Sequence, residues 1–140
     1  MRSAYGRVIE LGPGSGNQIH RYDSSRVELI YGIEPNASYR DVIAAKVEKA
    51  GLKDKYKLLT CGLEDSDILQ KESVEEGSMD TILSIQVLCA VDDVRGVMRE
   101  AWKLLKPGGG FVFWEHVTNK DSATAITQSE CGVLIYAELS

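Results

Sequence analysis

The sequence lacks the features that mark a membrane-spanning, nucleic-acid-binding or disulfide-linked protein. No apolar stretch approaches the length of about 18 residues that crosses a bilayer, so we expect no transmembrane segment. Acidic residues outnumber basic ones by 21 to 16 and no run of lysine and arginine occurs, which disfavours a nucleic-acid partner. The three cysteines, Cys61, Cys89 and Cys131, are widely spaced in apolar surroundings. They predict reduced core thiols in a cytoplasmic protein, with neither a disulfide framework nor a metal site.

The chain does contain enough apolar sequence for one domain. It has 140 residues, of which 44% are hydrophobic, and a net charge of −5. That length and composition suffice to bury a sizeable core, so residues 1–140 are expected to form a single domain. Residues 1–6 lead directly into the first apolar segment, so we expect no signal peptide.

Short apolar segments alternate with segments of helical character along the chain. The expected strands are Arg7–Leu11, Val27–Ile33, Tyr56–Cys61, Met79–Ile85 and Gly110–Val117. Their interiors are nearly continuous apolar runs, as in strands that are covered on both faces. The alternation predicts an α/β fold, with a parallel sheet and helices on both of its faces.

Capping residues and glycines mark the ends of the helices. One helix is expected to begin after Asn36 or Ser38 and to stop at Gly51. Another is expected after Asp92 or Asp93, with apolar residues every three or four positions and a Lys-Pro-Gly-Gly stretch at its end. A further helix is expected between the first two strands.

The most informative motif is a glycine-rich loop that follows the first apolar run. Gly12, Gly14 and Gly16 alternate there, and they let the backbone turn sharply and approach a ligand because they have no Cβ. Glu34 ends the second apolar run, about 20 residues downstream, where an acid is placed to bind the two hydroxyls of a ribose. Together they predict a nucleoside cofactor on a βαβ unit. The alternatives are that the glycine loop is a tight structural turn without a ligand and that Glu34 is a solvated strand end.

The spacing of the motif favours one nucleoside cofactor over another. The dinucleotide fingerprint is GxGxxG, whereas this chain has GxGxG with Asn17 after it. Glu10 lies two residues before the first glycine, where a carboxylate would repel a pyrophosphate and suit a cationic amine. S-adenosylmethionine carries an ammonium group and no phosphate, so we expect it as the cofactor. An NAD-dependent oxidoreductase is the less favoured alternative.

The chain resembles a known family over residues 7–117. The motifs that carry the resemblance are the Glu-Leu-Gly-Pro-Gly-Ser-Gly loop at 10–16, the strand end at Glu34, Gly77–Asp80 and Leu104–Gly109. They resemble class I S-adenosylmethionine-dependent methyltransferases, in particular the type 11 methyltransferase domain. Trp114–Val117 is similar to the thiol-methylating branch and its fungal relatives. The resemblance implies a Rossmann-like sheet of strand order 3-2-1-4-5 and methyl transfer to a small-molecule acceptor, with a thiol as the candidate.

The resemblance also implies a role for each residue of the site. The three glycines would pass under the methionine end of the cofactor, with Glu10 near its amino group, and Glu34 would bind the ribose. Pro35–Asn36 would flank the adenine, and Glu64 or Asp65 would lie near the adenine amino group. Gln86–Val87 would line the methionine side through backbone contacts. The alternative for Glu64 and Asp65 is that they cap the short helix that follows.

Methyl transfer from a sulfonium needs little besides orientation and exclusion of water, because positive charge disappears in the displacement when the nucleophile is an anion. A base is needed only when the nucleophile is poorly ionised at neutral pH. His116 ends the fifth expected strand and is the candidate proton acceptor or acceptor contact, the alternative being a hydrogen-bonded strand-end residue. His20 is expected on a helix surface. No Asp/Asn-Pro-Pro-Tyr/Phe motif follows the fourth strand, which disfavours nucleobase and glutamine substrates.

The chain departs from the family pattern at both ends. Members usually carry helices before the first strand and two strands after the fifth, so we expect a shortened product or a fragment. A non-catalytic remnant that still binds the cofactor is therefore an alternative function. Residues 118–140 form a tail in which one more helix or strand fits. The free edge of the fifth strand must be paired by residues 132–139, covered by self-association or another partner, or left exposed.

Overall fold

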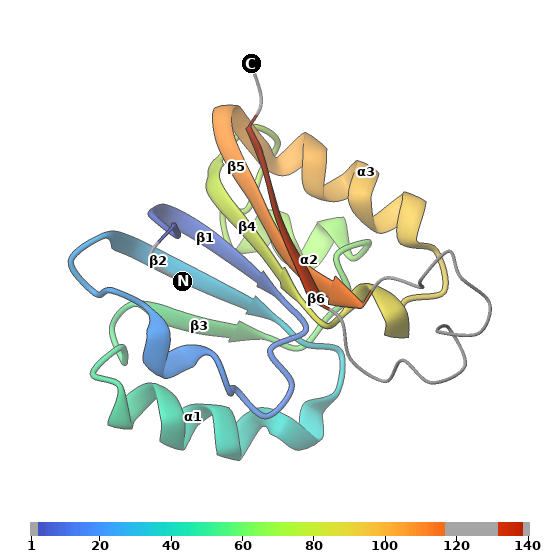
Figure 1. Cartoon of the computed structure of the whole chain (residues 1–140). Helices are drawn as coiled ribbons and strands as arrows, with labels where there is room; N and C mark the ends of the chain where they lie inside the picture. Colours follow the sequence, from blue (N-terminus) through green and yellow to red (C-terminus); the bar gives the residue numbers. More distant parts are fainter. Residues whose placement is uncertain (1–2, 117–131, 139–140) are drawn as a thin grey trace.

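The computed structural model describes residues 3–116 and 132–138 of the chain. They form a six-stranded sheet of order β3-β2-β1-β4-β5-β6 (Figure 1). The strands are β1 (Gly6–Leu11), β2 (Val27–Ile33), β3 (Tyr56–Leu59), β4 (Met79–Ile85), β5 (Leu105–His116) and β6 (Gly132–Glu138). The first five are parallel and β6 is antiparallel to β5. The predicted α/β class, Rossmann-like fold and strand order are confirmed.

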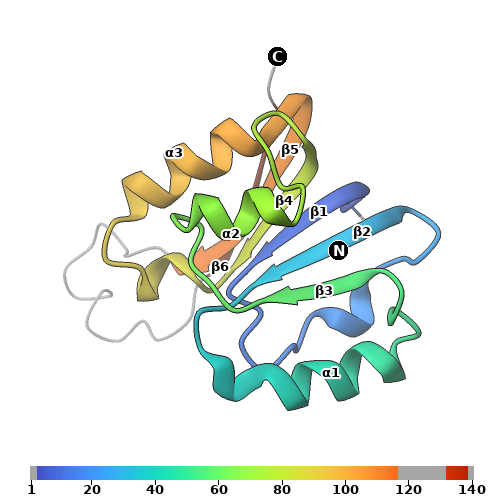
Figure 2. The same ribbon diagram turned by 180° about the vertical axis from the view of Figure 1, so that it is seen from behind.

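In the described part of the chain, three α-helices cover the two faces of this sheet, as Figures 1 and 2 show from opposite sides. They are α1 (Arg40–Lys49), α2 (Ser66–Lys71) and α3 (Val94–Leu104), and short 3₁₀ helices occur at Ile19–Arg21 (η1), Ala37–Tyr39 (η2) and Leu88–Ala90 (η3). Helix α1 packs on one face through Ile43 and Val47, whereas α2 and α3 pack on the other. The predicted placement of helices on both faces is therefore confirmed.

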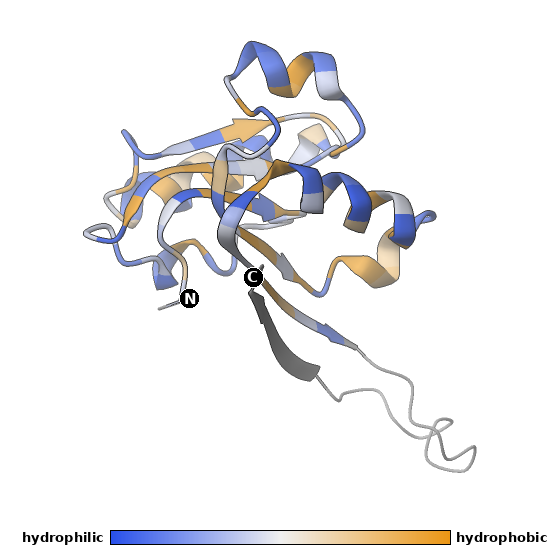
Figure 3. Ribbon diagram, turned by 90° about the horizontal axis from the view of Figure 1, so that it is seen from above, coloured by the Kyte–Doolittle hydropathy of each residue, from blue (hydrophilic) through white to orange (hydrophobic). Residues whose placement is uncertain are grey.

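Alternate residues of the central strands belong to different halves of the core, because successive side chains of a strand point to opposite faces. Val8 packs in the half beneath α1, and Ile9 packs in the half beneath α2 and α3. Leu83 and Ile82 of β4 divide in the same way. Figure 3 shows the resulting apolar segments along the strands and the hydrophilic residues of the helices. Both faces of the central strands β1 and β4 are thus covered, which explains their continuous apolar sequences.

The helix ends follow the predicted caps. The side chain of Asn36 accepts a hydrogen bond from the Ser38 amide at 3.0 Å and begins η2, which leads into α1. Asp93 accepts one from the Gly96 amide at 2.9 Å and begins α3. Gly51 follows α1 with a φ of +68°, a left-handed conformation that glycine adopts without strain.

The predicted helix between β1 and β2 is present only as the three-residue 3₁₀ helix η1, and His20 lies exposed on it, as expected for a helix surface. Three glycines with positive φ occupy the start of this connection. Ile19 and Tyr22 are its only residues in the core before β2, so the segment has no repeating apolar face that could hold a longer helix against the sheet.

Two further expectations need correction. The fifth strand begins at Leu105, earlier than predicted, because Leu105 pairs with Met79 across a shift in register. The prediction that the cysteines are core thiols holds for Cys61, which is buried, and is wrong for Cys89, which is exposed on η3. Cys131 and Val117 lie outside the described residues.

The apolar run of the tail forms a strand, one of the two predicted alternatives. Strand β6 pairs with β5 along its length, from Gly110 opposite Glu138 to His116 opposite Gly132. The edge of β5 is therefore paired within the chain, and self-association stays a prediction. None of the helices in the described part of the chain is long and apolar enough to cross a membrane.

Candidate functional site

The carboxyl ends of the first four strands meet at one edge of the sheet, where the strand order reverses beside β1. Open α/β sheets bind ligands at such a switch point. Two hollows lie there, of about 840 and about 230 Å³. Leu11 and Gly12, at the end of β1, line both of them. The pair of hollows is the candidate site.

The glycine-rich loop after β1 forms the wall of the smaller hollow. Gly12, Gly14 and Gly16 have φ values of +50°, +52° and +74°, which side chains rarely adopt. A Cβ on Gly12 would lie 2.9 Å from a methyl carbon of Val87, and one on Gly16 would lie 2.7 Å from Ile19 Cδ1. Glycine is therefore required at both positions for the loop to approach its neighbours this closely.

Glu34, directly after β2, joins that loop to the next one. Its carboxylate accepts hydrogen bonds from the Gly14 amide on Oε2 and from the Asn36 amide on Oε1, both at 2.9 Å. The side chain is buried. Each carboxylate oxygen has a further lone pair, so the same group can also accept from ligand hydroxyls. The solvated strand end is thereby excluded as an interpretation of this residue.

Glu10 borders the smaller hollow and is almost completely buried. The hydroxyl of Tyr56 donates a hydrogen bond to its carboxylate at 2.9 Å. The Tyr22 hydroxyl is buried as well and has no hydrogen-bond partner among the described residues. Loss of solvation raises the pKa of Glu10 to about 7, against the opposing effects of the nearby Tyr56 and Tyr22 hydroxyls. A cation in the hollow would be attracted to the charged form of this carboxyl.

Some of the other predicted site residues line the larger hollow. Pro35, Glu64 and Val87 line it. Asp65 stands at the start of α2, but its carboxylate turns back to accept a hydrogen bond from the Gly62 amide at 2.7 Å. The two acids thus differ: Glu64 faces the hollow, and Asp65 holds the loop that carries it.

One wall of this hollow is not among the residues predicted from the sequence. The segment before α3 and its first turns contribute Val91, Asp92, Asp93, Gly96, Val97, Arg99 and Glu100. This segment follows β4 just as the other site loops follow their strands, which is the signal that would have identified it.

The turn after β4 separates the two hollows. Gln86 lines the smaller one and Val87 the larger one. Gln86 has a φ of +57°, which is uncommon for a residue with a side chain. His116 ends β5 at the same edge of the sheet, where its backbone pairs with Gly132. Its role as a proton acceptor stays a prediction.

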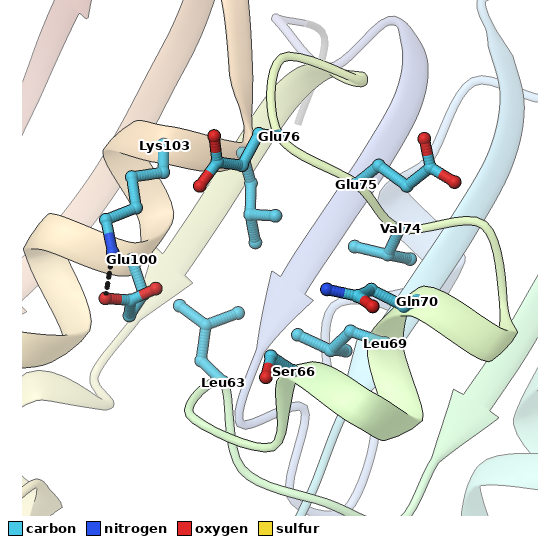
Figure 4. A pocket seen from close by; sticks show the side chains of 10 residues that line it. Leu63, Ser66, Leu69, Gln70, Val74, Glu75, Glu76, Glu100 and Lys103 are labelled. Atoms are coloured by element: carbon cyan, nitrogen blue, oxygen red, sulfur yellow. Dashed lines mark hydrogen bonds and ion pairs between the residues drawn. The ribbon is translucent and has the colours of Figure 1, made fainter.

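A third hollow, of about 350 Å³, lies between α2 and α3 (Figure 4). Leu63, Leu69 and Val74 form its apolar part, and the Lys103–Glu100 ion pair of 2.8 Å lies at its side. Of the predicted site residues, none lines it. A further hollow of about 330 Å³ lies beside β4 and β5, and Gln86 is the one predicted site residue that lines it. The other predicted residues that line a hollow lie in the pair at the strand ends, which is therefore the candidate site.

Known proteins share both sequence and fold with this chain. A family model described as a methyltransferase domain matches residues 9–113. The thiol S-methyltransferase TMT1B of Rattus norvegicus is 27% identical over 120 residues, which cover 85% of this chain and 46% of the relative. The human thiol S-methyltransferase TMT1A is 29% identical over 112 residues, with coverages of 79% and 42%. The chain thus spans less than half the length of these relatives.

Solved structures with the same fold include enzymes of different chemistry. The [4+2]-cyclase SpnF superposes with a TM-score of 0.72 at 20% identity, covering 87% of this chain and 43% of the cyclase. An S-adenosylmethionine-dependent methyltransferase from Aquifex aeolicus gives 0.65 at 15% identity, with coverages of 83% and 59%. These likenesses establish the fold.

The tight contact of Gly12 predicts an unusually costly alanine substitution. Gly12→Ala adds a Cβ against Val87 in addition to the backbone penalty of roughly 1–2 kcal/mol for a left-handed residue. Gly51→Ala is the matched control, because Gly51 has a φ of +68° and no atom within 4 Å of its Cβ position. Urea unfolding should show that Gly12→Ala lowers the free energy of unfolding more than Gly51→Ala does. Equal losses would mean that the Val87 contact relaxes freely.

The burial of Glu10 predicts a stability that falls as the pH rises. Its pKa is about 7 in the folded chain against an ordinary value of 4.5, so the folded state holds this proton more tightly. The bound proton of Glu10 contributes roughly 3 kcal/mol to the free energy of unfolding. This contribution is complete below pH 4.5 and is lost between pH 4.5 and about pH 7. Glu10→Gln cannot ionise, so the difference in unfolding free energy between the two proteins should change over this range. Parallel pH profiles would contradict the raised pKa.

Proposed function

The chain belongs to the type 11 methyltransferase domain family of class I S-adenosylmethionine-dependent methyltransferases, and we propose that it uses S-adenosylmethionine to methylate a small-molecule acceptor. The observation that carries this proposal is the carboxylate of Glu34. It stands at the end of β2 with bonds to the Gly14 and Asn36 amides, between the loops that border both hollows. An acid in this place suits the two hydroxyls of a ribose.

The two hollows suit the two ends of this cofactor. In our proposal the larger hollow takes the adenine beside Pro35, Leu63 and Glu64, and the smaller one takes the methionine end against the glycine loop and Glu10. Asn36 contributes its backbone amide to Glu34, while its side chain caps η2. The buried carboxyl of Glu10 would be paired with an ammonium group, whereas a pyrophosphate would be repelled there. This asymmetry supports S-adenosylmethionine over NAD.

The chemistry that the cofactor supplies is an electrophilic methyl group on a sulfonium. The residues of the chain have the remaining tasks, which are to bind, to orient and to exclude water. Gly12 and Val87 approach each other where the hollows meet, and this close packing limits the space in which the reacting atoms can move. We propose a thiol as the acceptor, in line with the named activity of the relatives, and His116 as the group that takes up its proton.

A second candidate function is a domain that binds the cofactor without catalysis. This candidate is favoured by the short match, which covers only 46% of the TMT1B relative from Rattus norvegicus. More than half of that relative lies outside the matched residues. Binding and turnover therefore have to be tested separately.

Calorimetry tests the cofactor proposal. We expect the wild-type chain to bind S-adenosylhomocysteine and to give no heat with NAD. Glu34→Gln should weaken binding by roughly 10- to 100-fold, because hydrogen bonds to a charged group are lost. Glu28→Gln, an exposed substitution on the same strand, is the control and should leave the affinity unchanged. NAD binding without S-adenosylhomocysteine binding would refute the proposal.

An activity assay separates the enzyme from the cofactor-binding domain. The chain is supplied with S-adenosylmethionine labelled in its methyl group and with panels of thiols and phenols. We expect label to appear in a thiol, and His116→Gln to slow the transfer most at a pH below the pKa of that thiol. Good cofactor binding with no labelled product from any acceptor would support the non-catalytic alternative.

A further inference from the structure

Glu115 is a buried carboxylate near the end of β5, and no part of the proposed function uses it. Its side chain is 6% exposed. Oε1 accepts hydrogen bonds from Ser84 Oγ at 2.7 Å and from the Val87 amide at 3.1 Å, and Oε2 accepts one from the Leu88 amide at 3.1 Å. The ion pairs found among the described residues do not include it. Its charge is thus stabilised by hydroxyl and amide donors.

These donors belong to β4 and to the turn that follows it. Ser84 is the penultimate residue of β4, and Val87 and Leu88 begin the short helix η3. The first amides of a helix have no partner within it. Glu115 supplies acceptors for two of them from the neighbouring strand, and therefore does for this turn what a capping side chain does for a helix.

The turn needs such support because its conformation is strained. Gln86 has a φ of +57°, and the left-handed conformation costs a residue with a side chain roughly 1–2 kcal/mol. The Gln86 amide is tied to the Trp114 carbonyl at 2.8 Å, which extends the β4–β5 ladder by one bond. Beyond that bond, the Glu115 carboxylate provides the hydrogen bonds that hold the Val87 and Leu88 amides.

The position of this turn determines the shape of the candidate site. Gln86 lines the smaller hollow and Val87 the larger one. The methyl groups of Val87 lie 2.9 and 3.0 Å from the place that a Cβ on Gly12 would occupy. A movement of the turn would therefore change both hollows and the contact between them.

We propose that Glu115 is a positioning residue for cofactor binding, in that its carboxylate fixes the Gln86–Leu88 turn against the glycine-rich loop. The inference rests on the proposed S-adenosylmethionine site. The residue acts through the turn and not by contact with the cofactor.

The test is Glu115→Gln, which keeps the size of the side chain and removes one acceptor. The amide oxygen can still accept from Ser84 and Val87, but the NH₂ group then faces the Leu88 amide, donor against donor. Hydrogen exchange of the Val87 and Leu88 amides should become faster. The affinity for S-adenosylhomocysteine should fall roughly 10-fold, the equivalent of one hydrogen bond to a charged group.

Asp80→Asn is the matched control. Asp80 also holds neighbouring elements together, through the Arg7 amide at 2.8 Å and Lys106 Nζ at 2.7 Å. It lies at the opposite end of β4 from the candidate site. This variant should lose stability, while its affinity for S-adenosylhomocysteine and the exchange of the Val87 and Leu88 amides stay unchanged.

The outcomes separate this inference from the proposed function. Wild-type chain that does not bind S-adenosylhomocysteine would overturn the proposed function and the positioning role together. Wild-type binding that Glu115→Gln leaves unchanged would overturn the positioning role alone, as would equal losses of affinity in Glu115→Gln and Asp80→Asn. Should Glu115→Gln not fold, Glu115→Asp, one methylene shorter, is expected to show the same two changes, and wild-type values in that variant would also overturn the role.

Discussion

Burial of three carboxylates at one edge of the sheet constrains everything else about the candidate site. Glu10, Glu34 and Glu115 are nearly inaccessible, and none of them takes part in the ion pairs found among the described residues. An isolated buried charge is costly unless hydrogen bonds compensate for its lost solvation. For Glu34 and Glu115 the compensation comes from backbone amides and the Ser84 hydroxyl. Glu10 has only the bond from the Tyr56 hydroxyl, and its pKa is accordingly raised to about 7. The loops at this edge are therefore fixed by their bonds to Glu34 and Glu115.

The same arrangement determines which ligand the edge favours. Hydrogen bonds from neutral donors stabilise a carboxylate without cancelling its charge, so a charged carboxylate at this edge would attract a cation. S-adenosylmethionine brings an ammonium and a sulfonium, and both would be attracted there. A pyrophosphate would meet repulsion from the same groups. Fold alone does not establish the chemistry of this edge, since a [4+2]-cyclase superposes as well as a methyltransferase does.

The sequence predicted the parts of the molecule that depend on local patterns. The apolar runs, the alternating glycines and the acid after the second run lead directly to the strands, the loop and Glu34. The roles of Asp65 and Glu115 could not be predicted in this way. Asp65 turns back to Gly62 instead of facing the hollow, and Glu115 reaches the turn after β4 only because β4 and β5 pair in one particular register. Register and side-chain direction are tertiary properties, and the pattern of neighbouring residues does not contain them.

A common principle relates the two sides of the site. Strands β1 and β4 lie side by side in the middle of the sheet, and each is followed by a loop that borders the hollows. A carboxylate from the next strand outward holds each loop: Glu34 after β2 binds the Gly14 amide, and Glu115 on β5 binds the Val87 amide. Between these two attachments the loops touch where Gly12 meets Val87, with no space for a Cβ. Neither loop can move without breaking a bond to a buried charge or separating from the other loop. The outer strands thus determine the geometry of a site that the inner strands form, which explains how loops of so few residues can hold a fixed shape.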